Sequence, residues 1–313
     1  MRTLITGVAG FIGSHLAERL LSQGHQVVGI DCFTDYYPRP IKQANLEVAK
    51  AHNSFTFIEG DIVDLELEPI VRNVDWVFHQ AAQAGVRASW GRTFEVYSKD
   101  NILATQRVLE AAKTAGLQKF VYASSSSIYG EAESYPTPET VTPRPISPYG
   151  ITKLAAEQLC YLYWCSFGVP TVSLRYFSVY GPRQRPDMAF NKFIKAILLD
   201  QQIEVYGDGE QTRDFTYVAD AVTANIIAAE HGPGGSIMNI GGGSRTSVNE
   251  NIGTLEDILG KKANVAYLEA QPGDARHTAA DTSLAQKLIG YQPIVRLREG
   301  LEQEALWLQA LIK

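Results

Sequence analysis

Several features that mark particular protein classes are scarce in this sequence of 313 residues. The only cysteines are Cys32, Cys160 and Cys165, an odd number without metal-ligand spacing, so neither a disulfide framework nor a metal site is expected. No basic stripe runs through the chain, and 28 Lys+Arg against 34 Asp+Glu give a net charge of -6. We therefore expect no nucleic-acid partner.

Long hydrophobic runs and sequence repeats are lacking as well. The strongly apolar stretches have the length of strands, and the chain starts without the charged and apolar regions of a secretory signal. We therefore expect a cytoplasmic protein with no membrane partner. The 26 Gly and 14 Pro are scattered without a period, which excludes collagen-like and coiled-coil rods. With 45% hydrophobic and 20% charged residues, the composition is typical of a globular chain with two lobes around one cleft.

The first half of the chain alternates β-branched runs with helical stretches. This order predicts repeated βαβ units, and hence an α/β fold with a doubly wound parallel Rossmann sheet. Beyond residue 180 the pattern loosens into short elements separated by glycine clusters. We expect a Rossmann domain over residues 1–180, completed by segments after 210, and a smaller, partly interleaved α/β substrate domain over 181–313. The expected strands are 3–6, 26–30, 55–58, 76–78, 119–123 and 171–174, and the expected helices are 11–21, 93–115 and 149–167.

A glycine pattern follows the first expected strand and opens the first expected helix. Its glycines are spaced three and three, whereas the familiar dinucleotide fingerprint has two and three. Glycine lets the backbone approach a pyrophosphate at a helix N-terminus, although a tight βα turn without a ligand gives the same pattern. The candidate cofactor-binding residues of this segment are Gly7, Gly10, Phe11, Ile12 and Gly13.

Acidic residues follow the second and third expected strands. Asp31 lies 18 residues past Gly13, where a carboxylate would hydrogen-bond the ribose hydroxyls of an adenosine. It would repel a 2′-phosphate, which favours NAD over NADP. Asp61 and Ile62 are candidates for the adenine, but an Asp at the start of a turn is equally typical of a cap.

Tyr149 and Lys153 lie one turn apart on the same face of the expected helix 149–167. A nearby ammonium stabilises a phenolate and lowers the tyrosine pKa from its usual value of about 10, so Tyr149 could remove a substrate proton. Four serines end the fifth expected strand, where an open α/β sheet exposes side chains to ligand. The Ser125 hydroxyl would hold the reacting oxygen there, although a serine loop can also simply satisfy its own backbone.

Taken together, these residues resemble the extended short-chain dehydrogenase/reductase superfamily, whose members modify nucleotide sugars. The resemblance extends over nearly the whole chain. It implies NAD in the Rossmann domain, with Ala81 and Ala82 beside it, a UDP-sugar in the smaller domain, and a homodimer formed by the two long helices. The residues that carry it are Gly7, Gly10, Gly13, Asp31, His79 to Ala82, Ser124, Ser125, Tyr149, Lys153, and Arg213 to Val218.

The two residues after Ser125 distinguish among the reactions of the superfamily. Similar dehydratases carry Asp-Glu at these positions, and similar decarboxylases usually carry a Glu at the second. Here Ser126 and Ser127 occupy them. The resemblance therefore implies epimerisation, which needs one proton acceptor, one hydride acceptor and room for the sugar to turn.

The segment 180–190 is similar to that of UDP-glucuronate 4-epimerases, whereas the loop of UDP-glucose 4-epimerases is not rich in arginine. A guanidinium binds a C6 carboxylate bidentately, so Arg185 is the candidate for this contact, with Ser126, Ser127 and Ser178 as further donors. The expected reaction is NAD-dependent 4-epimerisation of UDP-glucuronate to UDP-galacturonate through a 4-keto intermediate. UDP-glucose 4-epimerisation, a net NAD-dependent reduction and a non-catalytic NAD-binding scaffold remain open.

Three further residues are candidates for the nucleotide end of the substrate. The resemblance assigns Arg213 to the diphosphate and Asp274 to the nucleotide ribose. Arg87 follows the fourth expected strand and would face either the diphosphate or the sugar.

Overall fold

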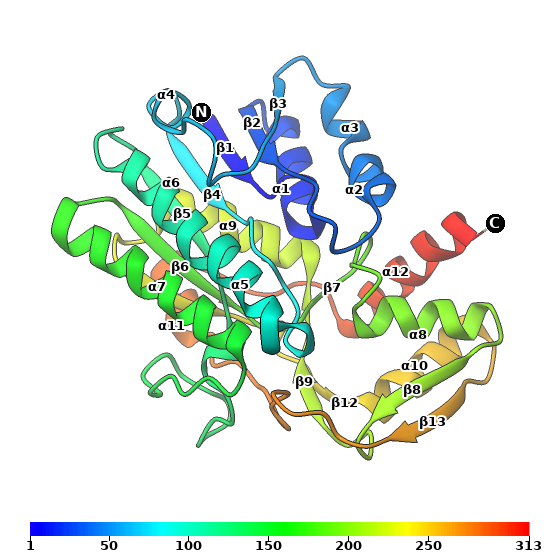
Figure 1. The fold of residues 1–313 in the computed structure, drawn as a ribbon. Helices are drawn as coiled ribbons and strands as arrows, with labels where there is room; N and C mark the ends of the chain where they lie inside the picture. Colours follow the sequence, from blue (N-terminus) through cyan, green and yellow to red (C-terminus); the bar gives the residue numbers. More distant parts are fainter. Residues whose placement is uncertain (313) are drawn as a thin grey trace.

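The computed structural model describes residues 1–312, which form a seven-stranded parallel sheet and a smaller group of elements beside it (Figure 1). The strand order is β11-β6-β5-β4-β1-β2-β3, and every neighbouring pair is parallel. The predicted doubly wound α/β fold is therefore confirmed. All six predicted strands belong to this sheet, which β11 from the last third of the chain completes. The strands are β1 (Arg2–Thr6), β2 (Gln26–Asp31), β3 (Phe55–Glu59), β4 (Trp76–His79), β5 (Lys119–Ser125), β6 (Thr171–Tyr176) and β11 (Ser236–Ile240).

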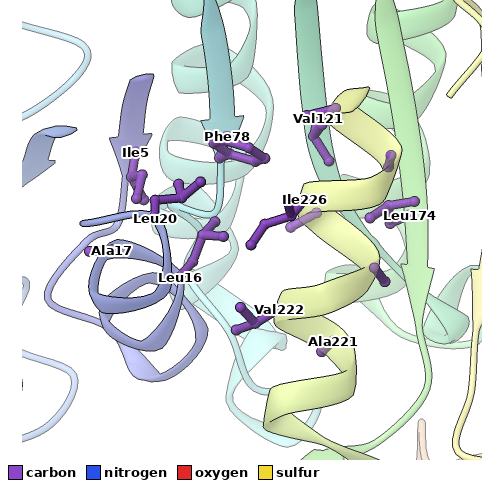
Figure 2. Close-up of a cluster of buried hydrophobic side chains, with 14 of the residues drawn as sticks. Ile5, Leu16, Ala17, Leu20, Phe78, Val121, Leu174, Ala221, Val222 and Ile226 are labelled. Atoms are coloured by element: carbon purple, nitrogen blue, oxygen red, sulfur yellow. The ribbon is translucent and has the colours of Figure 1, made fainter. Parts of the chain in front are cut away.

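Helices cover both faces of the sheet because successive strand residues point to opposite sides. Ile5 and Phe78 belong to one hydrophobic core, whereas their neighbours Leu4 and Val77 belong to the other. Figure 2 shows the first core, in which side chains from α1 and α9 meet the sheet. The helices on this face are α1 (Phe11–Ser22), α3 (Glu47–Lys50), α9 (Val218–His231) and α11 (Ser283–Ile289), and those on the opposite face are α4 (Glu68–Val71), α6 (Ala104–Ala112) and α7 (Pro148–Phe167).

The longest helix of the sheet region, α7, has clear signals at both ends. The Ser147 hydroxyl accepts a hydrogen bond from the Gly150 amide at 3.1 Å, and Pro148 occupies the first helical position. The helix stops at Gly168, whose φ of 70° suits glycine. These signals place Tyr149 and Lys153 in its first two turns, at the edge of the sheet where ligands bind.

The prediction of one uninterrupted α-helix over residues 93–115 is wrong. The chain instead runs through η2 (Gly91–Thr93), α5 (Phe94–Tyr97), the π-helical turn η3 (Ser98–Leu103) and α6, which ends at Ala112. The wider turn brings Asn101 inward, where its amide donates to the Gln83 carbonyl at 3.0 Å and to the Thr152 hydroxyl at 2.9 Å. The helix period is therefore broken where a side chain ties this segment to α7.

The smaller group lies to the lower right of the sheet in Figure 1 and has its own core, built from α8, β8, α10, β13 and α12. Segments of the second half thus alternate between this group and the large sheet, to which α9, β11 and α11 belong. None of the helices in residues 1–312 combines the length and apolarity that crossing a membrane requires. The remaining elements are α2 (Arg39–Asn45), η1 (Arg87–Ser89), η4 (Ser126–Ile128), β7 (Val179–Tyr180), α8 (Ala189–Leu198), β8 (Gln202–Tyr206), β9 (Thr212–Asp214), β10 (Thr216–Tyr217), β12 (Arg245–Ser247), α10 (Val248–Leu259), β13 (Asn264–Leu268) and α12 (Leu297–Ile312).

Candidate active site

A cavity opens where the carboxyl ends of β1, β4 and β5 meet the start of α7. It encloses about 1210 Å³, its open mouth included. The strand order reverses at β1, which lies between β4 and β2, and open α/β sheets bind ligands at this point. Every residue predicted to bind the cofactor lies on the cavity wall: Gly7, Gly10, Phe11, Ile12, Gly13, Asp31, Asp61, Ile62, Ala81, Ala82, Tyr149 and Lys153.

The glycine turn between β1 and α1 leaves no space for side chains. Gly7 has a φ of 70°, and a Cβ atom there would lie 2.7 Å from the Cα atom of Ala81. A Cβ atom on Gly13 would lie 2.2 Å from the Gly7 carbonyl oxygen. The turn is closed by the Gly10 amide, which donates to that same oxygen at 3.0 Å. Glycine is therefore required at positions 7 and 13 by the close approach of the backbone itself.

Asp31 ends β2 on the cavity wall, as predicted. Its two carboxylate oxygens accept backbone hydrogen bonds, one from Ala9 at 3.0 Å and one from Phe33 at 2.8 Å. Burial raises the pKa of Asp31, while these two amides and the Lys42 ammonium act in the opposite direction. The carboxylate is thus fixed in orientation at the rim of the glycine turn.

Asp61 closes a turn, one of the two roles that the sequence left open. One of its carboxylate oxygens accepts from the Val63 amide at 2.9 Å. The residue also lies on the cavity wall, and its contact with adenine stays a prediction. The other oxygen accepts from Lys99 at 2.6 Å. Burial acts to raise the pKa of Asp61, but the hydrogen bonds from Lys99 and Val63 outweigh it and the pKa is lowered.

Tyr149 and Lys153 are buried on the cavity wall. Burial raises the pKa of Tyr149, whereas the hydrogen bond with Ser125 and the positive charge of Arg185 lower it. Burial also lowers the pKa of Lys153 to about 7, opposed by Cys160 and Glu157. The Lys153 ammonium lies 4.5 Å from the centroid of the Tyr122 ring. Burial prevails, and the pKa of Tyr149 is raised overall. The cation that opposes burial is Arg185, whereas support from Lys153 stays a prediction.

A buried polar network stands directly behind these residues and was missed in the sequence. Glu157, on α7, accepts from Arg175 at 2.7 and 3.0 Å and from the Ser124 hydroxyl at 2.6 Å. Arg175, on β6, also donates to the Tyr129 hydroxyl at 2.6 Å. A signal existed, because position 157 follows Lys153 by four residues and so lies on the same helix face. The network fixes the end of β5 against α7.

Arg185, the residue predicted to contact the sugar carboxylate, lies on the loop between β7 and α8. Arg185 lies on the cavity wall with Tyr149, but its guanidinium is already bonded to Asp187, through Nε to one carboxylate oxygen at 2.9 Å and through Nη2 to the other at 2.9 Å. Asp187 and its second partner, Tyr36, were not among the predicted residues. The predicted hydroxyl donors follow wall residues by a few positions along the chain and are half-buried: Ser126, Ser127 and Ser178.

The three residues predicted for the nucleotide lie together, away from the cavity wall. Arg87 donates through Nε at 2.9 Å and through Nη2 at 2.6 Å to one oxygen of Asp274, and its guanidinium lies 4.3 Å from the centroid of the Tyr206 ring. Arg213 donates to the Arg276 carbonyl at 3.1 Å. Burial lowers the pKa of Arg213, and the Asp274 carboxylate is the first group that opposes this. Arg87 is therefore paired with Asp274, and Arg213 lies near enough to sense the charge of the same carboxylate.

Known proteins share this architecture over the full chain. The model of the NAD dependent epimerase/dehydratase family matches residues 3–241. A Bacillus subtilis protein named uncharacterized UDP-glucose epimerase YtcB is 45% identical over 99% of both chains. The UDP-glucuronate 4-epimerase of Thermodesulfobacterium geofontis is 41% identical over 97% of this chain and 95% of its own.

The similarity extends to solved structures with ligands. The UDP-glucuronic acid 4-epimerase of Bacillus cereus, in complex with UDP-glucuronic acid and NAD, superposes with a TM-score of 0.97. It is 45% identical, and the match covers 99% of this chain and 100% of the other. The two proteins therefore have the same fold over their whole lengths.

Proposed function

The chain belongs to the NAD dependent epimerase/dehydratase family. From this membership we propose that it is a UDP-glucuronate 4-epimerase, which forms UDP-galacturonate and uses NAD as its cofactor. The observation that carries the proposal is a cation at the sugar end of the cavity. Arg185 shares the cavity wall with Tyr149 and Lys153, and a guanidinium suits a C6 carboxylate but not a neutral hydroxymethyl group.

The cavity residues fit NAD. A Cβ atom on Gly13 would lie 2.2 Å from the Gly7 carbonyl oxygen, so the turn is built for close backbone approach, as a pyrophosphate at the N-terminus of α1 requires. Asp31 would accept from the adenosine ribose, and Asp61 with Ile62 would flank the adenine. Ala81, Ala82, Tyr149 and Lys153 would hold the nicotinamide half. When bound, NAD supplies a group that takes a hydride from C4 of the sugar and returns it.

Tyr149 would act as the base. Its phenolate would take the proton of the C4 hydroxyl while Ser125 donates a hydrogen bond to the same oxygen. Burial raises the pKa of Tyr149 overall, and the hydrogen bond with Ser125 and the positive charge of Arg185 oppose this rise. The Lys153 ammonium would add to the opposition and favour the phenolate. Turning of the 4-keto sugar about its diphosphate linkage would present the opposite face of C4 for return of the hydride, and Tyr149 would then return the proton to the same oxygen.

The neighbours of Ser125 favour epimerisation over elimination. Ser126 and Ser127 offer hydroxyl groups where an elimination needs an acid and a base. Within residues 1–312, the carboxylates on the cavity wall are those of Asp31 at the end of β2, Asp61 after β3 and Asp100 in η3. Arg185 and the serine hydroxyls would also hold the sugar carboxylate out of the alignment that permits loss of CO2.

The cluster of Arg87, Arg213 and Asp274 would bind the UDP group. Two guanidinium groups match a diphosphate, and the Asp274 carboxylate matches ribose hydroxyls. Arg87 is bonded to Asp274 by two hydrogen bonds, so the diphosphate would have to share or replace this pairing. This pairing beside Asp274 supports the diphosphate rather than the sugar as the proposed ligand of Arg87.

We also propose a homodimer in the cytoplasm. The helices α5, α6 and α7 lie side by side (Figure 1), with the turn η3 between α5 and α6. These elements leave apolar side chains exposed, among them Val96 (45%), Leu103 (39%) and Leu162 (50%). A second copy would cover this surface. Sedimentation is expected to give twice the mass of one chain, and a monomer would contradict the dimer. The three cysteines are free thiols, which suits a reducing compartment.

The proposed function is tested by NMR of the anomeric and C4 protons. The protein with NAD is expected to convert UDP-glucuronate to UDP-galacturonate and to leave UDP-glucose unchanged. Turnover of UDP-glucose alone would keep the mechanism and overturn the substrate, whereas bulk formation of NADH would indicate a net oxidation.

Tyr149→Phe tests the base in the same assay. Turnover is expected to fall by about 100-fold or more, because the proton acceptor is gone while the fold is kept. Tyr161→Phe, in an exposed position on the same helix, is the matched control and should retain full turnover. Similar rates for Tyr149→Phe and the wild-type protein would reject the assignment.

A further inference from the structure

Arg185 and Asp187 form an ion pair within one loop, the segment 181–188 between β7 and α8. The guanidinium donates through Nε and Nη2, so Asp187 occupies the side edge of its plane. The side chain of Arg185 is 20% exposed and that of Asp187 is 35% exposed. The ion pair therefore lies at the mouth of the cavity, with Arg185 as its inner member.

The outer edge of the Arg185 guanidinium remains available. A guanidinium has two edges that can bind a carboxylate bidentately, one formed by Nε with Nη2 and one by Nη1 with Nη2. Asp187 uses the first edge, and Nη1 donates to no group within residues 1–312. Since Arg185 lies on the wall of the cavity that also holds Tyr149, a carboxylate on a sugar at Tyr149 would meet the second edge.

Asp187 is itself held by a residue from a distant segment of the chain. The Tyr36 hydroxyl donates to one Asp187 oxygen at 3.2 Å, and the Arg185 guanidinium lies 5.8 Å from the centroid of the Tyr36 ring. Tyr36 belongs to the segment after β2, five residues past Asp31. Its hydroxyl lies against Gly85, where a Cβ atom would be only 2.3 Å away. Tyr36 thus has little freedom to move.

The other arginine of the loop shows that this arrangement is particular to Arg185. Arg183 turns away to α1, where it donates to Glu18 at 2.7 Å and to the Ser14 hydroxyl at 3.3 Å. Two arginines separated by one residue are thus each paired with a different acidic side chain. Only Arg185 is directed to the cavity.

We propose that Asp187, held by Tyr36, is a positioning residue that fixes the Arg185 guanidinium so that its Nη1 and Nη2 edge receives the carboxylate of a uronic acid. The inference rests on the proposed function and extends it to Asp187, which lies off the cavity wall behind Arg185. An arginine has several rotatable bonds, and holding one edge in advance removes most of the ordering that substrate binding would otherwise require. Burial acts to lower the pKa of Arg185, but the hydrogen bonds and charge of Asp187 outweigh it and the pKa is raised. The Arg185 guanidinium therefore keeps its positive charge.

The test compares Asp187→Asn with wild type. An amide presents a donor where the guanidinium also donates, so one of the two bonds is lost. KM for UDP-glucuronate is expected to rise about tenfold or more, with kcat within about threefold, because charge-assisted bidentate pairs are the strong ones. Calorimetry should show the same weakening for UDP-glucuronate and an unchanged Kd for UDP, which lacks the sugar. Tyr36→Phe, which keeps the ring, should move KM in the same direction by a smaller factor.

Asp200→Asn is the matched control, since Asp200 forms an exposed pair with Lys261 in the smaller group. It should leave KM and both Kd values unchanged. An Asp187→Asn protein with unchanged KM would overturn the inference, and a lowered KM would overturn it by showing that Asp187 competes with the substrate. Equal weakening of UDP and UDP-glucuronate would reveal a merely structural role. If the wild-type protein binds but does not convert UDP-glucuronate, the proposed function fails, while the calorimetry still decides the role of Asp187.

Discussion

Two fully buried glutamates, one beside the large sheet and one in the smaller group, have very different hydrogen-bond partners. Glu157 and Glu304 are both 0% exposed. Glu157 receives two hydrogen bonds from Arg175 and one from Ser124. Glu304, on α12, has a single partner, the Gly181 amide at 2.8 Å, and its other carboxylate oxygen has none within residues 1–312.

The two glutamates differ in how the structure compensates their burial: Glu157 is paired with a cation, whereas Glu304 is mainly protonated. Glu157 is held beside a cation that shares its burial, so the charge can persist where α7 meets the ends of β5 and β6. Burial raises the pKa of Glu304 to about 8, so at neutral pH this side chain is mainly protonated. Gly181 begins the loop that carries Arg185. The region behind Tyr149 is therefore locked by charge, while the base of the Arg185 loop depends on a proton.

The largest effect on stability is expected for Arg175→Met. The substitution leaves the Glu157 carboxylate buried without its cation, and breaking one side of such a pair lowers the free energy of unfolding by about 3–5 kcal/mol. Urea unfolding followed by circular dichroism measures this loss. The double variant Arg175→Met with Glu157→Leu should regain most of it, because a well-packed apolar pair often replaces a buried ion pair without loss. A single variant within about 1 kcal/mol of wild type would show that the ion pair is dispensable.

A smaller effect of opposite sign is expected for Glu304→Gln. In wild type, the carboxyl group loses its proton in the unfolded chain near pH 4.5 but in the folded chain only near pH 8, so stability falls as the pH rises between these values. Glutamine still accepts from Gly181 and does not ionise. The free energy of unfolding of the variant, relative to that of wild type, should therefore rise by roughly 2–4 kcal/mol when the pH is raised from 5 to 8.5. Unfolding at both pH values measures this change.

Glu133→Gln is the control for this titration and has the smallest expected effect. It makes the same chemical change in an exposed pair with Arg144, whose side chains are 75% and 73% exposed. Stability should change by less than about 0.5 kcal/mol at either pH. A similar pH slope in Glu133→Gln and Glu304→Gln would assign the titration to a group other than Glu304.

The grouping of the predicted cofactor-binding residues around one cavity could be predicted because its signals are local in the chain. Gly7, Gly10 and Gly13 lie in one turn, and Tyr149 with Lys153 lies on one helix face. In such cases spacing alone fixes which side chains meet. The six strands could be predicted for the same reason, because a buried strand is marked by adjacent residues. Leu4 and Ile5, for example, are neighbours in the chain and pack into the two different cores.

The substrate half could not be predicted in the same way because its contacts join distant segments. Tyr36 meets Asp187 across 151 positions, and Arg87 meets Asp274 across 187. No sequence periodicity connects residues so far apart in the chain. The local sequence around a loop arginine is also the same whether its guanidinium is solvated or paired with a carboxylate. The π-helical turn at Asn101 escaped for another reason: a single widened turn leaves the hydrophobic pattern of a helix nearly intact.

The place of β11 in the sheet has a consequence during synthesis. Tyr176 ends β6, but its parallel neighbour starts only at Ser236, 60 positions later. At ordinary rates of about 5–20 residues per second, a nascent chain therefore carries β6 as an open edge for roughly 3–12 s. Unpaired edges invite strand addition by other chains. A protein fragment that ends at residue 180 lacks β11, so the edge of β6 would stay unpaired permanently. We expect such a fragment to aggregate.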